Sequence, residues 1–174
     1  MNCEAARDSV RNPYCNLAKN CLTMNEIILM AHVMFGVLCM VGSVWLFVEV
    51  LHVTPGNLGR VRKFSLGIAV VMWLGYLLAG FWYVTRYSVD KAVILKGPWP
   101  FAHNFFMETK EHIVIVLLLL ATYLPIAVAN DLVANREARQ LVLWVAGLIA
   151  LTAFLAEGMG GIIAMGVKVG LQPG

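Results

Sequence analysis

Charged residues are scarce in this chain, which argues against a soluble domain. Lysine, arginine, aspartate and glutamate make up 13% of the 174 residues, whereas soluble domains carry roughly 25%. Hydrophobic residues make up 60%, so we expect an integral membrane protein of one domain in contact with the lipid bilayer. No basic run is long enough to form a phosphate-binding stripe, so we expect no nucleic-acid partner.

Short motifs of common enzymes and metal sites are also missing. The sequence has no G-x-S-x-G, no P-loop and no G-x-G-x-x-G, which leaves the ordinary metabolic enzymes without support. None of its four cysteines forms a C-x-x-C pair, so a zinc ribbon and covalent haem attachment are unsupported. Cys15 and Cys21 could pair on an oxidising side of the membrane, leaving Cys3 over, and Cys39 is expected to pack inside a helix.

Four apolar segments dominate the chain after a polar, cysteine-bearing tail at residues 1–26. The tail lacks the apolar core of a secretory signal peptide. Each apolar segment can cross about 30 Å of hydrocarbon, and together they cover about residues 27–53, 64–84, 113–129 and 141–167. Because short connections favour antiparallel neighbours, we predict an all-α integral membrane protein in which residues 27–174 form a four-helix up-down-up-down bundle.

Orientation follows from the basic residues of the two short hairpins, between the first and second helices and between the third and fourth. The hairpins hold five: Arg60, Arg62, Lys63, Arg136 and Arg139. The opposite side holds eight, spread over more chain. Cytoplasmic loops are rich in lysine and arginine near the membrane. The density of basic residues is higher in the hairpins, which predicts cytoplasmic hairpins with both termini outside. The total number of basic residues is higher on the opposite side, which predicts the reverse. A bacterial inner membrane is the expected location.

The long connection before the third helix carries the densest group of ionisable residues. Residues 89–95 are predicted to lie in the membrane interface, and Trp99 and Phe101 suit the headgroup level. The connection then leads through four ionisable residues into the third helix: His103, Glu108, Glu111 and His112. Ionisable groups at a membrane boundary are costly, so we treat these residues as functional candidates.

Topology places several ionisable residues at one level. The first and third helices enter from the side of the termini, so His32 and His112 lie near that face. Glu157 lies about sixteen residues into the fourth helix, or roughly 24 Å, and approaches the same face. The hairpin side offers Glu49 and His52, three residues apart on one helix face. We expect that pair to contact nearby basic residues rather than hold a metal.

The leading hypothesis is one b-type haem held by His32 and His112. Histidine is the usual axial ligand of non-covalent haem. Gly36 continues a stripe of small residues from His32, which allows close helix packing and also leaves room beside a flat cofactor. With Glu157 and Glu108 as proton or hydrogen-bond partners, the protein would be an electron-transfer subunit that works with other membrane redox subunits or quinone. The simpler alternative is that each histidine packs with its own hydrogen-bond partner.

Other hypotheses use the same residues. His103, Glu108 and His112, with His32, would suit a single transition-metal ion in an oxidase-assembly protein, because imidazole and carboxylate together admit several metals. Glu157 beside a histidine would suit a proton or quinone site, unless it simply pairs with His32, His112 or Lys110. A structural subunit of a larger membrane complex is the remaining possibility.

Parts of the chain resemble small four-helix membrane proteins of the b-type cytochrome and oxidase-assembly kind. The resemblance is carried by residues 96–100 (KGPWP), 111–114 (EHIV) and 124–125 (LP), and by Ala31-His32-Val33 with Gly36 in the first helix. It implies a four-helix fold and a haem between the first and third helices. Only His52 is available on the hairpin side, so the resemblance implies one haem or none.

Overall fold

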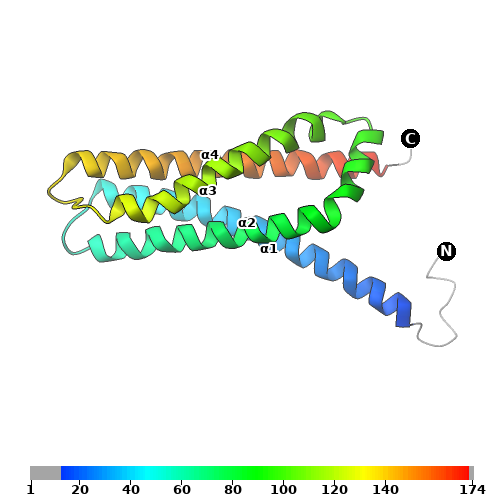
Figure 1. The fold of residues 1–174 in the computed structure, drawn as a ribbon, viewed down its shortest axis with the longest axis horizontal. Coiled ribbons are helices and arrows are strands. Elements are labelled where there is room, and N and C mark those ends of the chain that lie inside the picture. The colour runs from blue at the N-terminus through cyan, green and yellow to red at the C-terminus, as the bar shows by residue number, and fades with distance from the viewer. Residues whose placement is uncertain (1–12, 173–174) are drawn as a thin grey trace.

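The protein is an all-α four-helix bundle, as predicted. The structure, a computed structural model, describes the backbone of residues 13–172 and the side chains from residue 26 onward. In chain order, the elements are α1 (Pro13–Leu51), α2 (Leu58–Lys96), the short π-helix η2 (Ala102–Met107), α3 (Glu108–Val128) and α4 (Arg136–Gly170). Figure 1 shows the four long helices side by side, with η2 leading directly into α3.

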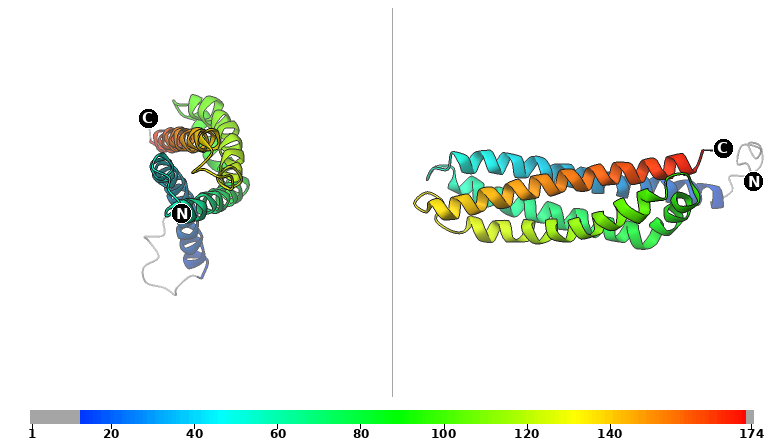
Figure 2. Two further views of the ribbon diagram at one scale, coloured as in Figure 1. Left: turned by 90° about the vertical axis from the view of Figure 1, so that its left-hand side faces the viewer. Right: turned by 90° about the horizontal axis from the view of Figure 1, so that it is seen from above.

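Consecutive long helices run antiparallel. Contacts join α1 to α2 and α4, and join α3 to α2 and α4, and the end-on view of Figure 2 shows this ring. We call the end with the α1–α2 and α3–α4 connections the hairpin face. The opposite end, with η2 and the C-terminus, is the terminus face. The N-terminal half of α1 diverges from the other helices there (Figure 1).

All four long helices are apolar enough to cross a membrane, so this is a multi-pass integral membrane protein. The candidate spans are Glu26–Leu51, Leu58–Lys96, Ala102–Val128 and Arg136–Gly170. "Exposed" below therefore means uncovered by the rest of the chain, whether lipid or water meets the side chain.

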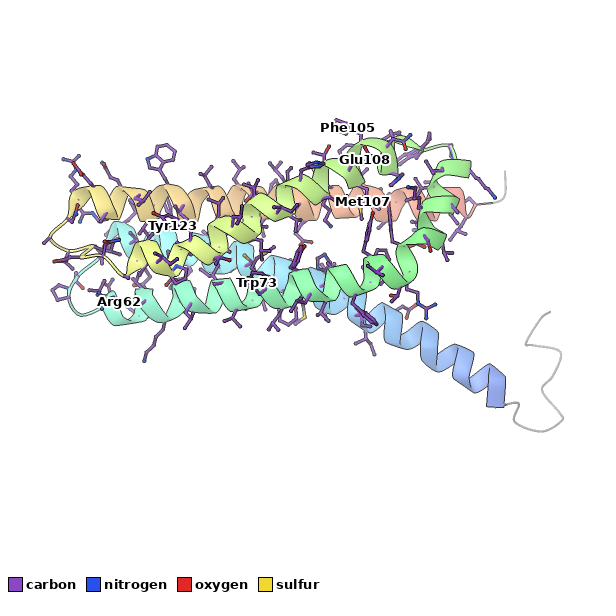
Figure 3. All side chains as sticks on the ribbon, in the orientation of Figure 1. Arg62, Trp73, Phe105, Met107, Glu108 and Tyr123 are labelled. Carbon is purple, nitrogen blue, oxygen red and sulfur yellow. The ribbon has the colours of Figure 1, made fainter. Side chains whose placement is uncertain are left out.

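Three helices are longer than a membrane is thick. Helices α1, α2 and α4 have 39, 39 and 35 residues, or roughly 50–60 Å at 1.5 Å per residue, whereas about 20 residues cross the hydrocarbon. Figure 3 shows Arg62 at the hairpin face and Glu108 toward the other end. These helices therefore continue beyond a hydrocarbon layer of ordinary thickness.

All four long helices begin earlier than predicted, and α1 and α2 extend furthest beyond the predicted bounds because nothing in the sequence stops them. Helix α1 begins at Pro13 rather than near residue 27. Helix α2 continues to Lys96, so residues 89–95 are its last turns, which curve toward η2 (Figure 1). No glycine or proline lies between Gly80 and Gly97, and such residues are what usually end helices. The predicted Cys15–Cys21 pairing, and Cys3, lie outside the side chains that the structure describes.

The main core fills the bundle from its centre to the hairpin face. Its fully buried side chains include Leu46, Val61, Leu124, Val142 and Ile149. A smaller cluster at the terminus face joins the end of α2 to η2 and α4 through Tyr87, Ile94, Ala102 and Ile163. This second cluster anchors the π-helix, and hence the start of α3, against the rest of the bundle.

A polar clamp closes the α1–α2 hairpin. The Glu49 carboxylate accepts hydrogen bonds from Arg60 Nη2 at 3.3 Å, from Asn57 Nδ2 at 3.1 Å and from Trp45 Nε1 at 3.3 Å. The predicted contact between Glu49 and a basic residue is therefore confirmed. His52 is exposed, and its Nδ1 lies 3.3 Å from the Val48 carbonyl oxygen, one turn back in its own helix.

Candidate functional site

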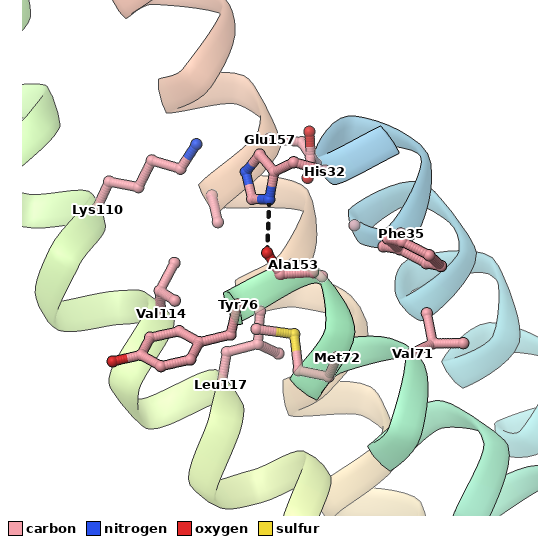
Figure 4. A pocket seen from close by; sticks show the side chains of 13 residues that line it. His32, Phe35, Val71, Met72, Tyr76, Lys110, Val114, Leu117, Ala153 and Glu157 are labelled. Carbon is pink, nitrogen blue, oxygen red and sulfur yellow. Dashed lines mark hydrogen bonds between the residues drawn. The ribbon is translucent and has the colours of Figure 1, made fainter. Parts of the chain in front are cut away.

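A cavity inside the bundle is lined by residues of all four long helices. Its volume is about 30 Å³, which is enough for one water molecule. Besides Tyr76 of α2, three ionisable side chains line it, each from a different helix: His32 of α1, Lys110 of α3 and Glu157 of α4. We call these three residues the polar cluster. Figure 4 shows them above an apolar floor that includes Met72 and Leu117.

His32 is held by the backbone of α2. Its Nδ1 lies 3.0 Å from the carbonyl oxygen of Gly75. A carbonyl oxygen only accepts hydrogen bonds, so Nδ1 carries the proton and donates it. In the neutral ring, Nε2 is then left as an acceptor. One hydrogen bond therefore fixes both the position of the imidazole and the nitrogen that it offers to the cavity.

Lys110 and Glu157 supply opposite charges to the cluster. Each carries an electrostatic interaction with the other, and the Lys110 ammonium group extends toward His32 (Figure 4). Among the described residues, no ion pair joins Lys110 directly to Glu157. A water molecule in the cavity could bridge the two groups by hydrogen bonds.

Two glycines make room for the charged side chains. A β-carbon at Gly36 would overlap the Glu157 carboxylate, and a β-carbon at Gly160 would lie 2.8 Å from Lys110 Nζ. Gly36 was predicted to leave space beside a flat cofactor. In the structure, the space beside it holds the carboxylate of Glu157.

His112 does not line the cavity. Its side chain is exposed, and its Nδ1 donates to the Glu108 carbonyl oxygen at 2.7 Å. Lys110, Val114 and Leu117 face the cavity, and residue 112 lies about 200° around the helix from residue 110. The structure thus brings His32 and Glu157 together with Lys110 and leaves His112 on another face of α3. The haem predicted between His32 and His112 stays a prediction that this arrangement does not favour.

His103 belongs to a separate buried contact at the terminus face. Its Nδ1 lies 2.8 Å from the Tyr87 hydroxyl, and the two side chains are 5% and 2% exposed. The Tyr83 ring stacks on Tyr87 with centroids 5.0 Å apart, and the Tyr83 hydroxyl faces Glu111. The end of the long connection is therefore the short π-helix Ala102–Met107, a form often found at functional sites.

The predicted non-haem metal site gains no support from the geometry. Within the described part of the chain, no three His, Cys, Asp or Glu side chains come together to hold a metal ion. Glu108 and His112 are both exposed, whereas His103 is buried against Tyr87. The proposal of a metal held by these residues and His32 stays a prediction.

Two groups at the cavity, Lys110 and the Gly75 carbonyl oxygen, were not predicted as members of the site. Lys110 was considered only as a partner of Glu157, although its spacing of four and seven residues from Val114 and Leu117 places all three on one helix face. The Gly75 carbonyl oxygen had no detectable signal, because every residue carries one. Comparison of the chain with protein-family models, with curated proteins and with solved structures finds no match, so the resemblance to small membrane cytochromes stays a prediction.

Proposed function

We propose that this protein takes up and releases protons at the polar cluster of His32, Lys110 and Glu157. One observation carries the proposal: three ionisable side chains from three helices surround one water-sized cavity. Ionisable residues inside transmembrane bundles are rare and often form proton relays. A purely structural role would be served more simply by a direct ion pair, which Lys110 and Glu157 do not form.

The chemistry of the cluster suits proton transfer. The Glu157 carboxylate accepts a proton, and so does the His32 Nε2 that the bond to Gly75 leaves free. Lys110 supplies a positive charge that offsets the carboxylate when the proton leaves. A single water molecule in the cavity would connect these groups by hydrogen bonds.

The size of the cavity argues against a larger ligand. Sites for drug-sized ligands have volumes of roughly 300–1,000 Å³, whereas this cavity has about 30 Å³. A haem or a quinone ring would enter only if the helices separated. Water and protons need no such change, so they are the ligands that we propose.

Infrared spectroscopy of the protein in lipid vesicles tests the proposal. During a pH titration, we expect a carboxylic-acid band that is lost in Glu157→Gln. The matched control is Glu108→Gln, which removes an exposed carboxylate outside the cavity and should keep the band. A titration that is unchanged by Glu157→Gln would contradict the proposal.

Electron transfer through one haem b between His32 and His112 remains an alternative prediction. It requires α3 to turn so that His112, now exposed, faces His32. A visible spectrum of protein produced with ample haem tests this alternative. A Soret band lost in both His32→Ala and His112→Ala would favour the haem over the proton site. Stoichiometric metal in elemental analysis would favour the single-metal alternative, and stable co-purification with other chains, without cofactor or metal, would favour the structural subunit.

A further inference from the structure

We infer that the polar cluster exchanges protons with the terminus face only, so that the protein on its own loads protons from one side and does not conduct them across the membrane. The inference rests on the proposed function and adds a direction to it. It follows from what lies on the two sides of the cavity.

The hairpin side of the cavity is closed by apolar side chains. Met72, Leu117 and Ala153 line the cavity on that side and are 7%, 3% and 2% exposed. Beyond them, the main core continues through fully buried Leu46 and Ile149.

Buried polar side chains are few in the half of the bundle between the cavity and the hairpin face, and they already have hydrogen-bond partners. Among the described residues, they are Ser43 and Ser65. The Ser43 hydroxyl donates to the Cys39 carbonyl oxygen at 2.7 Å, and the Ser65 hydroxyl donates to the Arg62 carbonyl oxygen at 2.8 Å. Both bonds stay within one helix, so neither serine links the cavity to the hairpin face.

Titratable residues are almost absent from the same half. Residues 37–48, 64–74, 114–128 and 141–155 contain no Asp, Glu, His, Lys or Arg. Their other titratable groups are Cys39, which is fully buried, and Tyr123, whose side chain is 42% exposed on the outer surface. From Glu157 to Arg139, the nearest charged residue toward the hairpin face on α4, the rise is about 27 Å. A proton would have to cross this distance without a relay.

The terminus side offers a shorter route. A hydrocarbon layer of about 20 residues that starts near Arg139 at the hairpin face ends near residue 159 of α4. Glu157 then lies just inside the boundary of that layer at the terminus face. The side chains of the polar cluster are partly exposed rather than buried. Helix α1 diverges from the bundle on this side (Figure 1). Water at the terminus face therefore needs to penetrate only a short way to reach the cluster.

Reaction with a small, charged, membrane-impermeant methanethiosulfonate in sealed vesicles of the two orientations tests the inference. The background is the full chain with its four cysteines replaced by alanine, and Glu157→Cys reports on the cavity. Glu108→Cys and Ala134→Cys, both at exposed positions, identify the terminus and hairpin faces. Ile149→Cys, at a fully buried position, should not react from either side.

We expect Glu157→Cys to react from the side that labels Glu108→Cys and not from the side that labels Ala134→Cys. Lys110→Cys provides a second report from the same cavity, in case Glu157→Cys fails to fold. Reaction from the hairpin side, from both sides or from neither would overturn the inference.

Proton flux separates the inference from the proposed function. In vesicles with a pH gradient and a pH-sensitive dye inside, we expect the wild-type protein to conduct no faster than empty vesicles. A flux that Glu157→Gln abolishes would overturn one-sided access and still support proton exchange. A carboxylic-acid band whose pH titration is unchanged by Glu157→Gln, in contrast, would remove the proposed function whatever the labelling pattern.

Discussion

The carboxylate of Glu157 occupies the position where residue 36 would carry a β-carbon, so Gly36 is what allows α1 and α4 to meet beside the cavity. This contact links helix packing to the polar cluster. A change at either residue is expected to alter both the stability of the bundle and the position of the charge.

The first prediction concerns Gly36→Ala. The added methyl group overlaps the Glu157 carboxylate, which is the far end of a flexible side chain and can move, so the loss should lie at or below the low end of the about 1–3 kcal/mol that overpacking costs. We expect a lower melting temperature in detergent. Gly67→Ala is the control, because a β-carbon there meets nothing within 4 Å and alanine favours a helix. The double variant Gly36→Ala, Glu157→Ala should recover much of the loss; no recovery would show that the carboxylate is not the group displaced.

The second prediction concerns the buried contact of Tyr87 with His103. Tyr87→Phe removes the hydroxyl that lies 2.8 Å from His103 Nδ1 and leaves a buried ring nitrogen without that partner. Such a loss costs about 1–3 kcal/mol, measured as a fall in thermal stability. Tyr123→Phe, at an exposed tyrosine, is the matched control and should change stability little. Equal effects of the two variants would argue against the importance of this bond.

The third prediction concerns the packing contact between the π-helix η2 and α4. A β-carbon at Gly166 would lie 2.7 Å from the β-carbon of Ala102. Neither group can swing aside, so Gly166→Ala should push η2 away from α4 and destabilise the protein by about 1–3 kcal/mol. Gly161→Ala adds a methyl group with nothing within 4 Å and should be tolerated. Similar melting temperatures for both variants would contradict the close packing.

The fourth prediction compares the two histidines that were predicted to act together. Because His32 lines the cavity and His112 does not, His32→Ala should change the pH titration of the Glu157 infrared band. His112→Ala should leave the titration as it is in the wild type. If both variants altered it to the same extent, His112 would have to reach the cluster, as the haem hypothesis requires.

Hydropathy was sufficient to predict the class of the fold. Four apolar segments, separated by two short hairpins and one long connection, predicted the antiparallel bundle that the structure contains. The N-terminal start of α1 and the extension of α2 were missed, because charged and polar residues outside the hydrocarbon do not prevent a helix from continuing. At the far end, Gly97 and Pro98 follow the last residue of α2, as expected of helix-breaking residues.

The level of a residue along the bundle axis was also predictable. Counting along antiparallel helices placed His32 and Glu157 near one face, and the two residues line the same cavity. The same counting placed His112 there, yet that side chain is exposed. Counting gives depth along a helix, but the direction of a side chain also depends on the rotation of that helix about its axis.

The amino-acid sequence by itself determined the number of helices, their order and the depth of each ionisable group, because these follow from local hydrophobicity and chain connectivity. Tertiary structure alone decided which groups meet. The π-helix bonds each residue to the fifth one along rather than the fourth, and so changes the register in which α3 continues. The contacts of η2 with α2 and α4 then hold α3 with Lys110 toward the cavity. The pairing of His32 with the Gly75 carbonyl oxygen likewise depends on a backbone atom that only packing brings into reach.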